Sequence, residues 1–469
     1  MAETSRAVAI GTAVSLAPWQ EDVVGAGELY RVGGVVRDRL LGIEHVEDSD
    51  YLVRGIEPAR LEAILSRHGR VALVGKFFGV YHFTPDGLPP CDIAFPRVEQ
   101  STGPGHREFA VQTDWRLPVE DDLRRRDFTI NAMAERLPDG TRVDPLGGET
   151  DLRERRLRMI FPAAFEEDPL RILRGARFAA RFDLSIDDAT ARAMQAASAL
   201  LATVSAERVQ EELSKLLTQC VTPGRGLDLL HTLGGLAVVL PELDRCHGVT
   251  QNEYHPDDVY VHSLKVCDAA RRESLLVRWA ALLHDVGKVD ARQTVEDERG
   301  RRVVFYGHEV VSAGLAHQVL ERLRYPHAFV SRCTHLVREH MFRYEPAWKP
   351  VTVRRFMARI GVENVDDLFA LREADCRSRD LRDELALLEE LKERVRLELE
   401  ARSGMKVADL AVGGDDIMDV LQTRPGPKVG EVLNYLLDRV LEEPELNTRE
   451  TLLKLARTNF SDEREKGGK

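Results

Sequence analysis

The chain has 469 residues, of which 43% are hydrophobic and 31% charged, and its formal net charge at pH 7 is −12. This length predicts roughly three domains, and the composition excludes collagen-like and wholly disordered proteins. Because the sequence shows neither a secretory leader nor an apolar run of ~18–20 residues, we predict a cytoplasmic protein without a membrane partner. The negative charge does not exclude a nucleic-acid partner, since such binding depends on a local basic surface.

The predicted secondary structure changes character along the chain. Residues 1–27 are weakly patterned and predict a loosely held extension. From residue 28 to 151, short apolar runs alternate with helical pieces, which indicates a mixed sheet. The strands predicted for this sheet are residues 29–32, 51–53, 71–74, 80–83 and 92–95. Helical periodicity then continues to about residue 460 and includes an amphipathic helix at 385–399, so the predicted fold class is α+β and mostly α.

A glycine pair marks the first candidate site. Residues 30–38 read Y-R-V-G-G-V-V-R-D, which predicts a strand that ends at Gly33 and Gly34 and a helix that carries Arg37 and Asp38. The glycines let the backbone approach a phosphate, and the helix start offers it unpaired N–H groups. Arg37 adds a charge-assisted contact. An ordinary tight turn between a strand and a helix also explains this pattern.

Three acidic residues of the same region are candidates for metal binding. Asp48 and Asp50 are two positions apart at the start of a predicted strand, so both side chains lie on one face. Such a pair can hold Mg²⁺, although an acidic loop in solvent explains it too. Asp92 lies inside another predicted strand, where a charge is costly unless it is paired, metal-bound or exposed.

An arginine-rich segment follows at residues 121–134, which read D-D-L-R-R-R-D-F-T-I-N-A-M-A. Arg125 and Arg126 offer planar guanidinium groups to phosphate oxygens and ribose. We predict that a helix follows, which places Asn131 on the same face as Asp127. A solvated basic surface is the alternative interpretation.

The order of these three motifs resembles the class II tRNA nucleotidyltransferases and bacterial poly(A) polymerases, a branch of the DNA polymerase β superfamily. The likeness continues in residues 167–174 (E-D-P-L-R-I-L-R) with Arg177, and in the neck motif at 205–215. It covers residues 28 to 460. The resemblance implies a polymerase-β-like head with a mixed sheet, a helical neck, an HD helical domain and a helical tail. The predicted boundaries are 1–27 for the extension, 28–151 for the head, 152–250 for the neck, 251–400 for the HD domain and 401–469 for the tail.

The resemblance also implies roles for single residues. Asp48 and Asp50 would hold Mg²⁺ and, with Asp92, form the catalytic carboxylates. Asp168 and Arg171 would bind the Watson–Crick edge of the incoming base, although a helix pair at i, i+3 explains their spacing as well. Arg208 and Lys215 would contact RNA. The implied nucleotide-binding residues are Gly33, Gly34, Arg37, Asp38, Arg126, Asp127, Asn131, Asp168, Arg171, Arg174 and Arg177.

Histidines concentrate between residues 251 and 400. Adjacent His284 and Asp285, with a histidine before them and an aspartate after, resemble the signature of HD metal-dependent phosphohydrolases. The implied ligands of a divalent transition metal (Mn, Ni, Co or Fe) are His262, His284, Asp285, His308, His340 and Asp375. Asp285 would bridge two ions in a binuclear site, and Lys288 and Arg379 would hold phosphate. An HD fold kept only for packing is the alternative.

The tail contains one further candidate. Pro425-Gly426-Pro427 predicts a helix start, with Lys428 close to the N-terminus, where a phosphate of RNA can be contacted. A helix-capping turn explains this segment equally well.

Together these patterns predict an enzyme that adds C, C and A to the 3′ acceptor end of tRNA from CTP and ATP, with an attached phosphohydrolase. A poly(A) polymerase shares the catalytic motifs and stays an alternative. A CC-only enzyme is another. The resemblance implies that CC-only members have a shortened loop before the R-R-D motif, so the long segment at residues 96–120 favours full CCA addition. The third alternative is an HD phosphohydrolase whose polymerase half only binds RNA. The sequence leaves the oligomeric state open.

Overall fold

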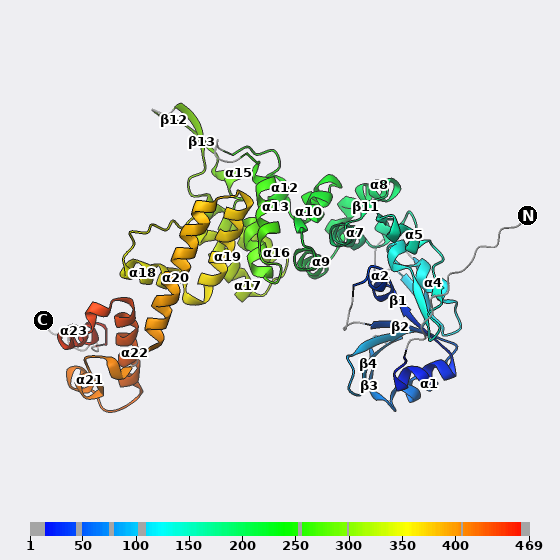
Figure 1. Ribbon diagram of the computed structural model, residues 1–469, viewed down its shortest axis with the longest axis horizontal. Helices are drawn as coiled ribbons and strands as arrows, with labels where there is room; N and C mark the ends of the chain where they lie inside the picture. The colour runs from blue at the N-terminus through cyan, green and yellow to red at the C-terminus, as the bar shows by residue number, and fades with distance from the viewer. Residues whose placement is uncertain are drawn as a thin grey trace, which may run out of the picture. The chain divides into compact units, whose positions relative to one another are not determined.

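The computed structural model describes residues 15–43, 49–74, 79–101, 109–251, 256–297, 300–404 and 407–460. It divides into two compact units, the first formed by residues 1–247 and 322–325 and the second by 248–321 and 326–469 (Figure 1). We describe each unit by itself. The described elements confirm an α+β fold that is mostly helical. Within these ranges, no helix is long and apolar enough to cross a membrane.

The first unit begins with the strands β1 (Glu28–Val32), β2 (Ser49–Arg54), β3 (Gly69–Val74), β4 (Val80–Pro85), β5 (Cys91–Ala94), β6 (Arg97–Ser101), β7 (Phe109–Thr113), β8 (Ala134–Leu137) and β9 (Arg142–Val143). The helices among them are α1 (Pro18–Ala26), α2 (Gly34–Leu40), α3 (Pro58–Leu65), α4 (Val119–Arg124) and the 3₁₀ turn η1 (Thr129–Asn131). Seven strands form one sheet in the order β3-β4-β5-β2-β1-β8-β9. The sheet is mixed because β2 and β5 run parallel, whereas the other neighbours are antiparallel. All five predicted strands are present.

Helix α1 corrects the prediction of a loosely held N-terminal extension. Trp19 and Val23 lie one helical turn apart and belong to the core between α1, α3 and the sheet. The Trp19 ring makes edge-to-face contacts with Tyr51 and Phe83, at centroid distances of 5.2 and 5.3 Å. The prediction is therefore wrong for Pro18–Ala26, which the apolar face of a single short helix ties to the sheet. Residues 1–14 lie outside the described residues.

Short elements and helices complete the first unit. They are α5 (Gly148–Arg153), β10 (Arg156–Leu157), α6 (Ala164–Glu167), α7 (Leu170–Phe182), β11 (Ser185–Ile186), α8 (Asp188–Ala197), η2 (Ser198–Thr203), α9 (Ala206–Gln219), α10 (Pro223–Thr232), α11 (Leu236–Val239) and α12 (Pro241–Asp244). Helix α7 is almost entirely buried and packs beside α9 and α10. A side chain at Gly175 would meet Met194 at 2.1 Å and Phe128 at 2.9 Å, so glycine allows this close approach.

The second unit contains a helical bundle and a smaller helical group. The bundle comprises α13 (Val259–Ala269), α14 (Leu275–Leu283), α15 (Lys288–Ala291), α16 (His308–Arg322), α17 (His327–Glu339), α18 (Pro350–Ile360), α19 (Val362–Ser378) and α20 (Arg382–Gly404), with the hairpin of β12 (Gln293–Asp297) and β13 (Gly300–Val304). The smaller group has its own apolar core and comprises η3 (Val407–Asp409), α21 (Gly414–Leu421), α22 (Pro427–Glu442), η4 (Pro444–Leu446) and α23 (Arg449–Phe460). The helix predicted at 385–399 lies within α20, and α22 begins at Pro427 as predicted. Figure 1 shows the hairpin extending away from the bundle.

Candidate nucleotide and metal sites

The turn from β1 into α2 brings the predicted glycine pair against two arginines. Gly33 has φ +68°, which favours glycine, and a side chain there would displace the guanidinium of Arg126. Arg37 is buried, and its guanidinium donates to Asp38 at 2.7 Å and to Oδ1 of Asn131 at 2.5 Å. The Arg37 guanidinium is therefore held in one orientation before any ligand binds.

Buried carboxylates hold the other arginines of this region in the same way. Asp122 is fully buried and accepts hydrogen bonds from Arg125 at 2.5 Å and from Arg126 at 3.1 Å. Burial by itself raises the pKa of Asp122, but these two guanidinium groups lower it below its usual range. Asp122 was missed from the sequence, since nothing in its motif distinguishes a buried carboxylate from an exposed one.

Asp127 is the centre of a second network. Its carboxylate accepts from the Phe128 backbone N–H at 2.8 Å, from Nδ2 of Asn131 at 2.9 Å and from Nε of Arg174 at 2.9 Å. Burial raises the pKa of this carboxyl, but the charge of Arg174 and the hydrogen bonds outweigh it and lower the pKa to about 2. The helix predicted after Asp127 is wrong, because the segment forms only η1. The side chain of Asp127 bonds the next backbone N–H and so competes with helix formation.

Helix α9 supplies the acidic partners of α7. Glu212 is buried and accepts from Arg177 at 2.8 Å and from Arg174 at 3.4 Å. Arg208 donates to Asp168 at 2.8 Å. The side chains of Asp168 and Arg171, the predicted base-reading residues, are therefore held by partners other than each other. Arg171 donates to the backbone oxygens of Ala164, at 3.1 Å, and of Arg125, at 3.2 Å.

Most of the arginines described above line one cavity of about 580 Å³ in the first unit. Its lining residues are Gly34, Arg37, Asp50, Arg125, Arg126, Asp127, Asn131, Asp168, Arg171, Arg174, Arg177, Phe178, Arg181, Lys215 and Gln219. Eight of them are cationic and three are acidic, which suits a polyanionic ligand. Sequence reasoning missed Phe178, Arg181 and Gln219, although Phe178 and Arg181 follow Arg174 and Arg177 at helical spacing.

Two of the three predicted acidic residues lie side by side, and one of them, Asp50, lines this cavity. The parallel register of β2 and β5 places Asp50 directly beside Asp92, and both are exposed. Asp92 also lies 2.9 Å from Nδ1 of His82, which sequence reasoning missed. Neighbouring carboxylates of this kind fit Mg²⁺, which prefers hard oxygen ligands. Asp48 lies outside the described residues.

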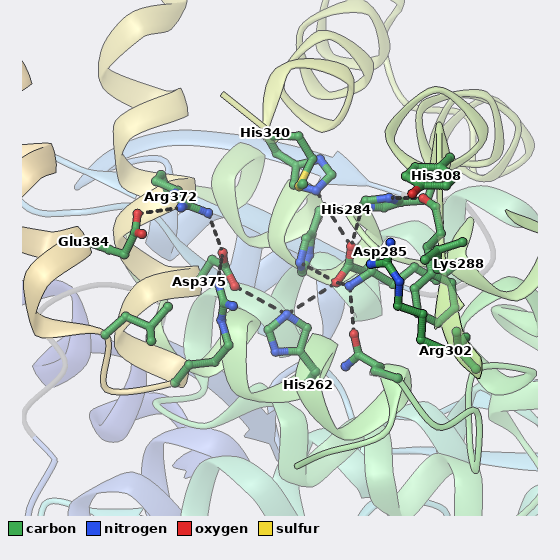
Figure 2. Close-up of a pocket in the computed structure, with 18 of the residues that line it drawn as sticks. His262, His284, Asp285, Lys288, Arg302, His308, His340, Arg372, Asp375 and Glu384 are labelled. Carbon is green, nitrogen blue, oxygen red and sulfur yellow. Dashed lines mark hydrogen bonds and ion pairs between the residues drawn. The ribbon is translucent and has the colours of Figure 1, made fainter. Parts of the chain in front are cut away.

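In the second unit, five elements bring the predicted histidines and aspartates together (Figure 2). Asp285 stands at the centre, with Nε2 of His262, His284, His308 and His340 at 3.4, 3.2, 3.2 and 3.7 Å from its carboxylate oxygens. Asp375 lies 3.4 Å from Nε2 of His262. All six side chains are at most 10% exposed.

The hydrogen bonds of three histidines explain why this cluster fits a cation. His284, His308 and His340 each place Nδ1 2.7 to 2.8 Å from a backbone carbonyl oxygen, which can only accept. Each Nδ1 therefore carries the proton, and in the neutral ring Nε2 is an acceptor that faces the carboxylate of Asp285. Burial lowers the pKa of His340 to about 3, so its ring is neutral. Two acceptors that face each other need a positive charge between them. A metal ion can supply it, and so can a proton on His284, whose pKa burial lowers but the Asp285 carboxylate raises above its ordinary value.

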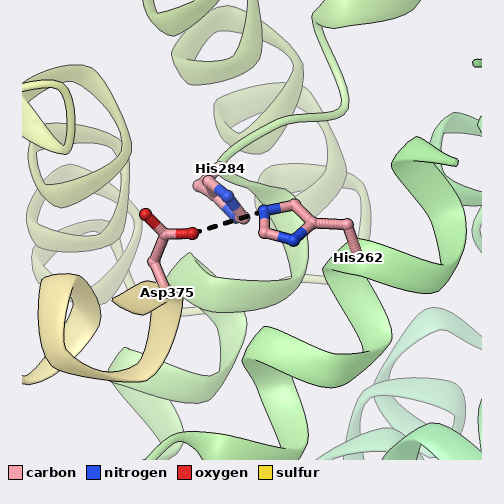
Figure 3. A group of neighbouring side chains, drawn as sticks. All are labelled: His262, His284 and Asp375. Carbon is pink, nitrogen blue, oxygen red and sulfur yellow. Dashed lines mark ion pairs between the residues drawn. The ribbon is translucent and has the colours of Figure 1, made fainter. Parts of the chain in front are cut away.

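Two overlapping groups have the geometry to hold a metal ion. One consists of His262, His284 and Asp375 (Figure 3), and the other of His284, Asp285 and His340. Within each group the ligand atoms lie within 4.8 Å of one another, and the two groups share His284. The alternative of a bundle kept only for packing gives no reason for acceptor atoms to converge in this way.

The HD cavity, as we call the space of about 720 Å³ above this cluster, is rimmed by cationic side chains. Lys288 donates to Asp285 at 2.7 Å and to Gln251 at 2.8 Å, and Arg379 donates to Asp375 at 2.7 Å. Lys288 and Arg379, the two predicted phosphate-binding residues, therefore line the cavity, and each forms an ion pair with an aspartate of the cluster. Sequence reasoning missed Gln251 and four further lining residues, namely Arg301, Arg302, Arg372 and Glu384.

The predicted RNA-binding residues lie in different settings. Lys215 lines the cavity of the first unit and bonds Glu211 at 2.6 Å, whereas Arg208 bonds Asp168. Lys428 is half-buried in the first turn of α22. Contact of these three residues with RNA stays a prediction.

Comparison with known proteins agrees with this arrangement. Residues 29–158 match the family described as the poly A polymerase head domain, 183–246 the probable RNA and SrmB-binding site of polymerase A, and 253–392 the HD domain. The fold is similar to that of the Bacillus stearothermophilus CCA-adding enzyme solved with CTP, with a TM-score of 0.62 and 24% identity over 94% of this chain and 98% of that one. At that identity the likeness shows the fold alone.

Two relatives with higher sequence identity are both named multifunctional CCA protein. The multifunctional CCA protein of Aromatoleum aromaticum is 40% identical over 351 residues, which are 73% of this chain and 82% of that protein. That of Xanthomonas oryzae pv. oryzae is 36% identical over 421 residues, covering 87% of this chain and 96% of the relative. Because both relatives are more than 30% identical and more than two thirds of each is covered, the chain belongs to the multifunctional CCA protein family.

Proposed function

We propose that this protein adds C, C and A to the 3′ end of tRNA, using CTP and ATP and releasing pyrophosphate. The observation that carries the proposal is the cavity of the first unit, where eight cationic side chains surround the candidate base-reading pair and Asp50. The names of the relatives, and structural neighbours solved with CTP and with tRNA, support it. We place the protein in the cytoplasm, with the head at 28–151, the neck at 152–250, the HD domain at 251–400 and the tail at 401–469.

In this proposal the arginines bind the triphosphate. Three of them, Arg37, Arg126 and Arg174, line the cavity with orientations already fixed by buried carboxylates behind them, which belong to Asp38, Asp122 and Asp127. Charge-assisted hydrogen bonds to phosphate oxygens then cost little reorganisation. Asp48 and Asp50 would hold Mg²⁺, with Asp92 beside them. Bound Mg²⁺ would lower the pKa of the RNA 3′-hydroxyl and neutralise charge on the leaving pyrophosphate.

We assign nucleotide choice to Asp168 and Arg171. A carboxylate accepts from the exocyclic amine that cytosine and adenine share, and it repels the carbonyl that uracil presents at that position. Arg208 fixes the Asp168 carboxylate through Oδ2, and the two backbone contacts of Arg171 fix its guanidinium plane. The pair would thus be preorganised for one hydrogen-bonding pattern.

A second activity is favoured by the convergent histidine acceptors around Asp285. We propose that the HD cavity holds one or two divalent transition metal ions and hydrolyses phosphate esters such as 2′,3′-cyclic nucleotides. A metal ion in such a site supplies an activated water at neutral pH. Lys288 and Arg379, at the rim, would position the phosphate.

Product sequencing tests the main proposal. The purified protein is incubated with tRNA that ends at the discriminator base, with CTP and ATP supplied singly and together. We expect two C residues with CTP alone and CCA with both. A long A tract would identify a poly(A) polymerase, and arrest after CC with both nucleotides would identify a CC-only enzyme. The absence of any extension would support the third alternative, an HD phosphohydrolase whose polymerase half only binds RNA.

A further inference from the structure

A second cavity adjoins the HD cavity, and no role considered so far uses it. This groove, of about 470 Å³, lies among α16, α17 and α18. Its lining residues that matter here are Arg338, Arg343, Arg355, Arg359 and Trp348. Met341 follows the candidate ligand His340 and lines both cavities. The two spaces are therefore neighbours at the end of α17, with Met341 as a common lining residue.

The charge of the groove is opposite to that of the chain as a whole. Four arginines line it against two glutamates, Glu309 and Glu339, whereas the whole chain carries −12. All four arginines are exposed, and the ion pairs of Arg343 and Arg355 are long, at 3.9 and 3.5 Å. Among the residues placed by the structure, Arg338 has no acidic group within ion-pair distance. Arg359 is paired with Glu339 at 3.3 Å, so Arg338, Arg343 and Arg355 are the guanidinium groups most available to a polyanion.

The floor of the groove is aromatic. The Trp348 ring is half-buried and rests on Phe356, with centroids 5.8 Å apart. A partly accessible indole among exposed arginines is the combination that single-stranded nucleic acids use, because bases stack on the ring and phosphates follow the cations.

We propose that this arginine–aromatic groove binds the last nucleotides of a single-stranded RNA whose 3′-terminal phosphate or 2′,3′-cyclic phosphate enters the HD cavity. The inference rests on the proposed phosphohydrolase activity and narrows its substrate to RNA ends, in preference to mononucleotides. The strand would pass over Met341, with its terminal phosphate at the metal cluster and the preceding bases over Trp348.

The first test compares substrates of different length. Full-length protein loaded with Mn²⁺ is given 2′,3′-cyclic AMP or a hexanucleotide ending in a 2′,3′-cyclic phosphate. We expect a higher kcat/KM for the hexanucleotide, lowered about tenfold in Arg338→Gln/Arg343→Gln, with cyclic AMP hydrolysis unchanged. The hexanucleotide preference should also weaken with salt. Arg396→Gln, on the exposed face of α20, is the control and should behave as the parent protein.

The second measurement does not depend on hydrolysis. A hexanucleotide with 4-thiouridine two positions before a 3′-phosphate is crosslinked to the full chain, and the modified peptides are mapped. We expect crosslinks within residues 338–359, lost in the double variant and kept in the control. Crosslinks confined to the first unit, or equal kcat/KM values for both substrates in the parent protein, would overturn the proposal. Absence of all hydrolysis with crosslinks still at 338–359 would instead refute the phosphohydrolase and retain the groove.

Discussion

Replacing Asp127 by asparagine should destabilise the first unit by about 2–3 kcal/mol at pH 7. The pKa of Asp127 falls from its ordinary 3.8 to about 2 in the folded protein. With ~1.4 kcal/mol per pKa unit, this lowering corresponds to about 2–3 kcal/mol. The side chain is only 8% exposed, so solvent screens the interaction weakly. The neutral amide of the Asp127→Asn variant would still accept one hydrogen bond but would leave the Arg174 charge with Glu212 alone.

The sign of the pH dependence follows from the lowered pKa. A depressed folded-state pKa stabilises the protein above pH ~4 and loses its effect as the pH falls towards 2. The difference between parent protein and Asp127→Asn should therefore shrink to about 1 kcal/mol at pH ~3, where the parent carboxylate begins to be protonated.

Methionine oxidation can measure this effect in each unit separately. Met194 is fully buried in the first unit and Met357 in the second, and a short peroxide pulse oxidises each only when its surroundings unfold. In a urea series, the midpoint for Met194 should fall in Asp127→Asn, whereas the midpoint for Met357 should not change. An unchanged Met194 midpoint at pH 7, or equal shifts at both methionines, would show that the Asp127 network does not stabilise the first unit.

Three further predictions concern activity. Asp50→Ala should reduce CTP incorporation at least ~100-fold and leave metal-dependent phosphohydrolysis intact, since metal clamps of this kind contribute several kcal/mol; substantial labelled product would contradict its role at the cavity edge. Replacing Asp168 and Arg171 by alanine should relax discrimination against UTP more than it lowers turnover, measured as the ratio of kcat/KM values for CTP and UTP; an unchanged ratio would assign nucleotide choice elsewhere. Asp285→Ala should lose bound transition metal and cyclic nucleotide hydrolysis while tRNA extension continues, and a metal content equal to that of the parent would argue against the cluster.

The sheet was predictable where apolar residues cluster in short runs. Strands β1, β2, β4 and β5 bury apolar residues, whereas β3 was found from its apolar composition although Leu73 and Val74 are exposed. Strand β8, A-E-R-L, shows little contrast between its faces in sequence, and only the structure reveals its pairing with β1 and the burial of Ala134 and Leu137. Helix α1 could not be predicted for a similar reason. Its core contact depends largely on one aromatic residue, Trp19, and so short a helix shows no clear hydrophobic periodicity.

The site was predictable as motifs and not as contacts. Arg37, Arg126 and Arg174 are separated by many residues, and the chain order alone indicated that they act together. Their carboxylate partners depend on packing between distant segments, and neither Asp122 nor Glu212 differs in sequence from an ordinary surface acid. The HD ligands could be predicted more completely. Each lies at a helix end or on a buried helix face, where a charged or imidazole side chain stands out in an apolar sequence.

The buried acids also bear on how an acidic protein can bind a nucleoside triphosphate. Eight cationic side chains line the cavity of the first unit with three carboxylates, and Asp38, Asp122 and Glu212 lie directly behind the arginines. The sum of these charges is 8 − 3 − 3 = +2. A triphosphate carries roughly −4, so the cavity by itself leaves about two negative charges uncompensated. One divalent cation at Asp50 would balance them, so the proposed triphosphate site would need both the fixed arginines and a metal ion.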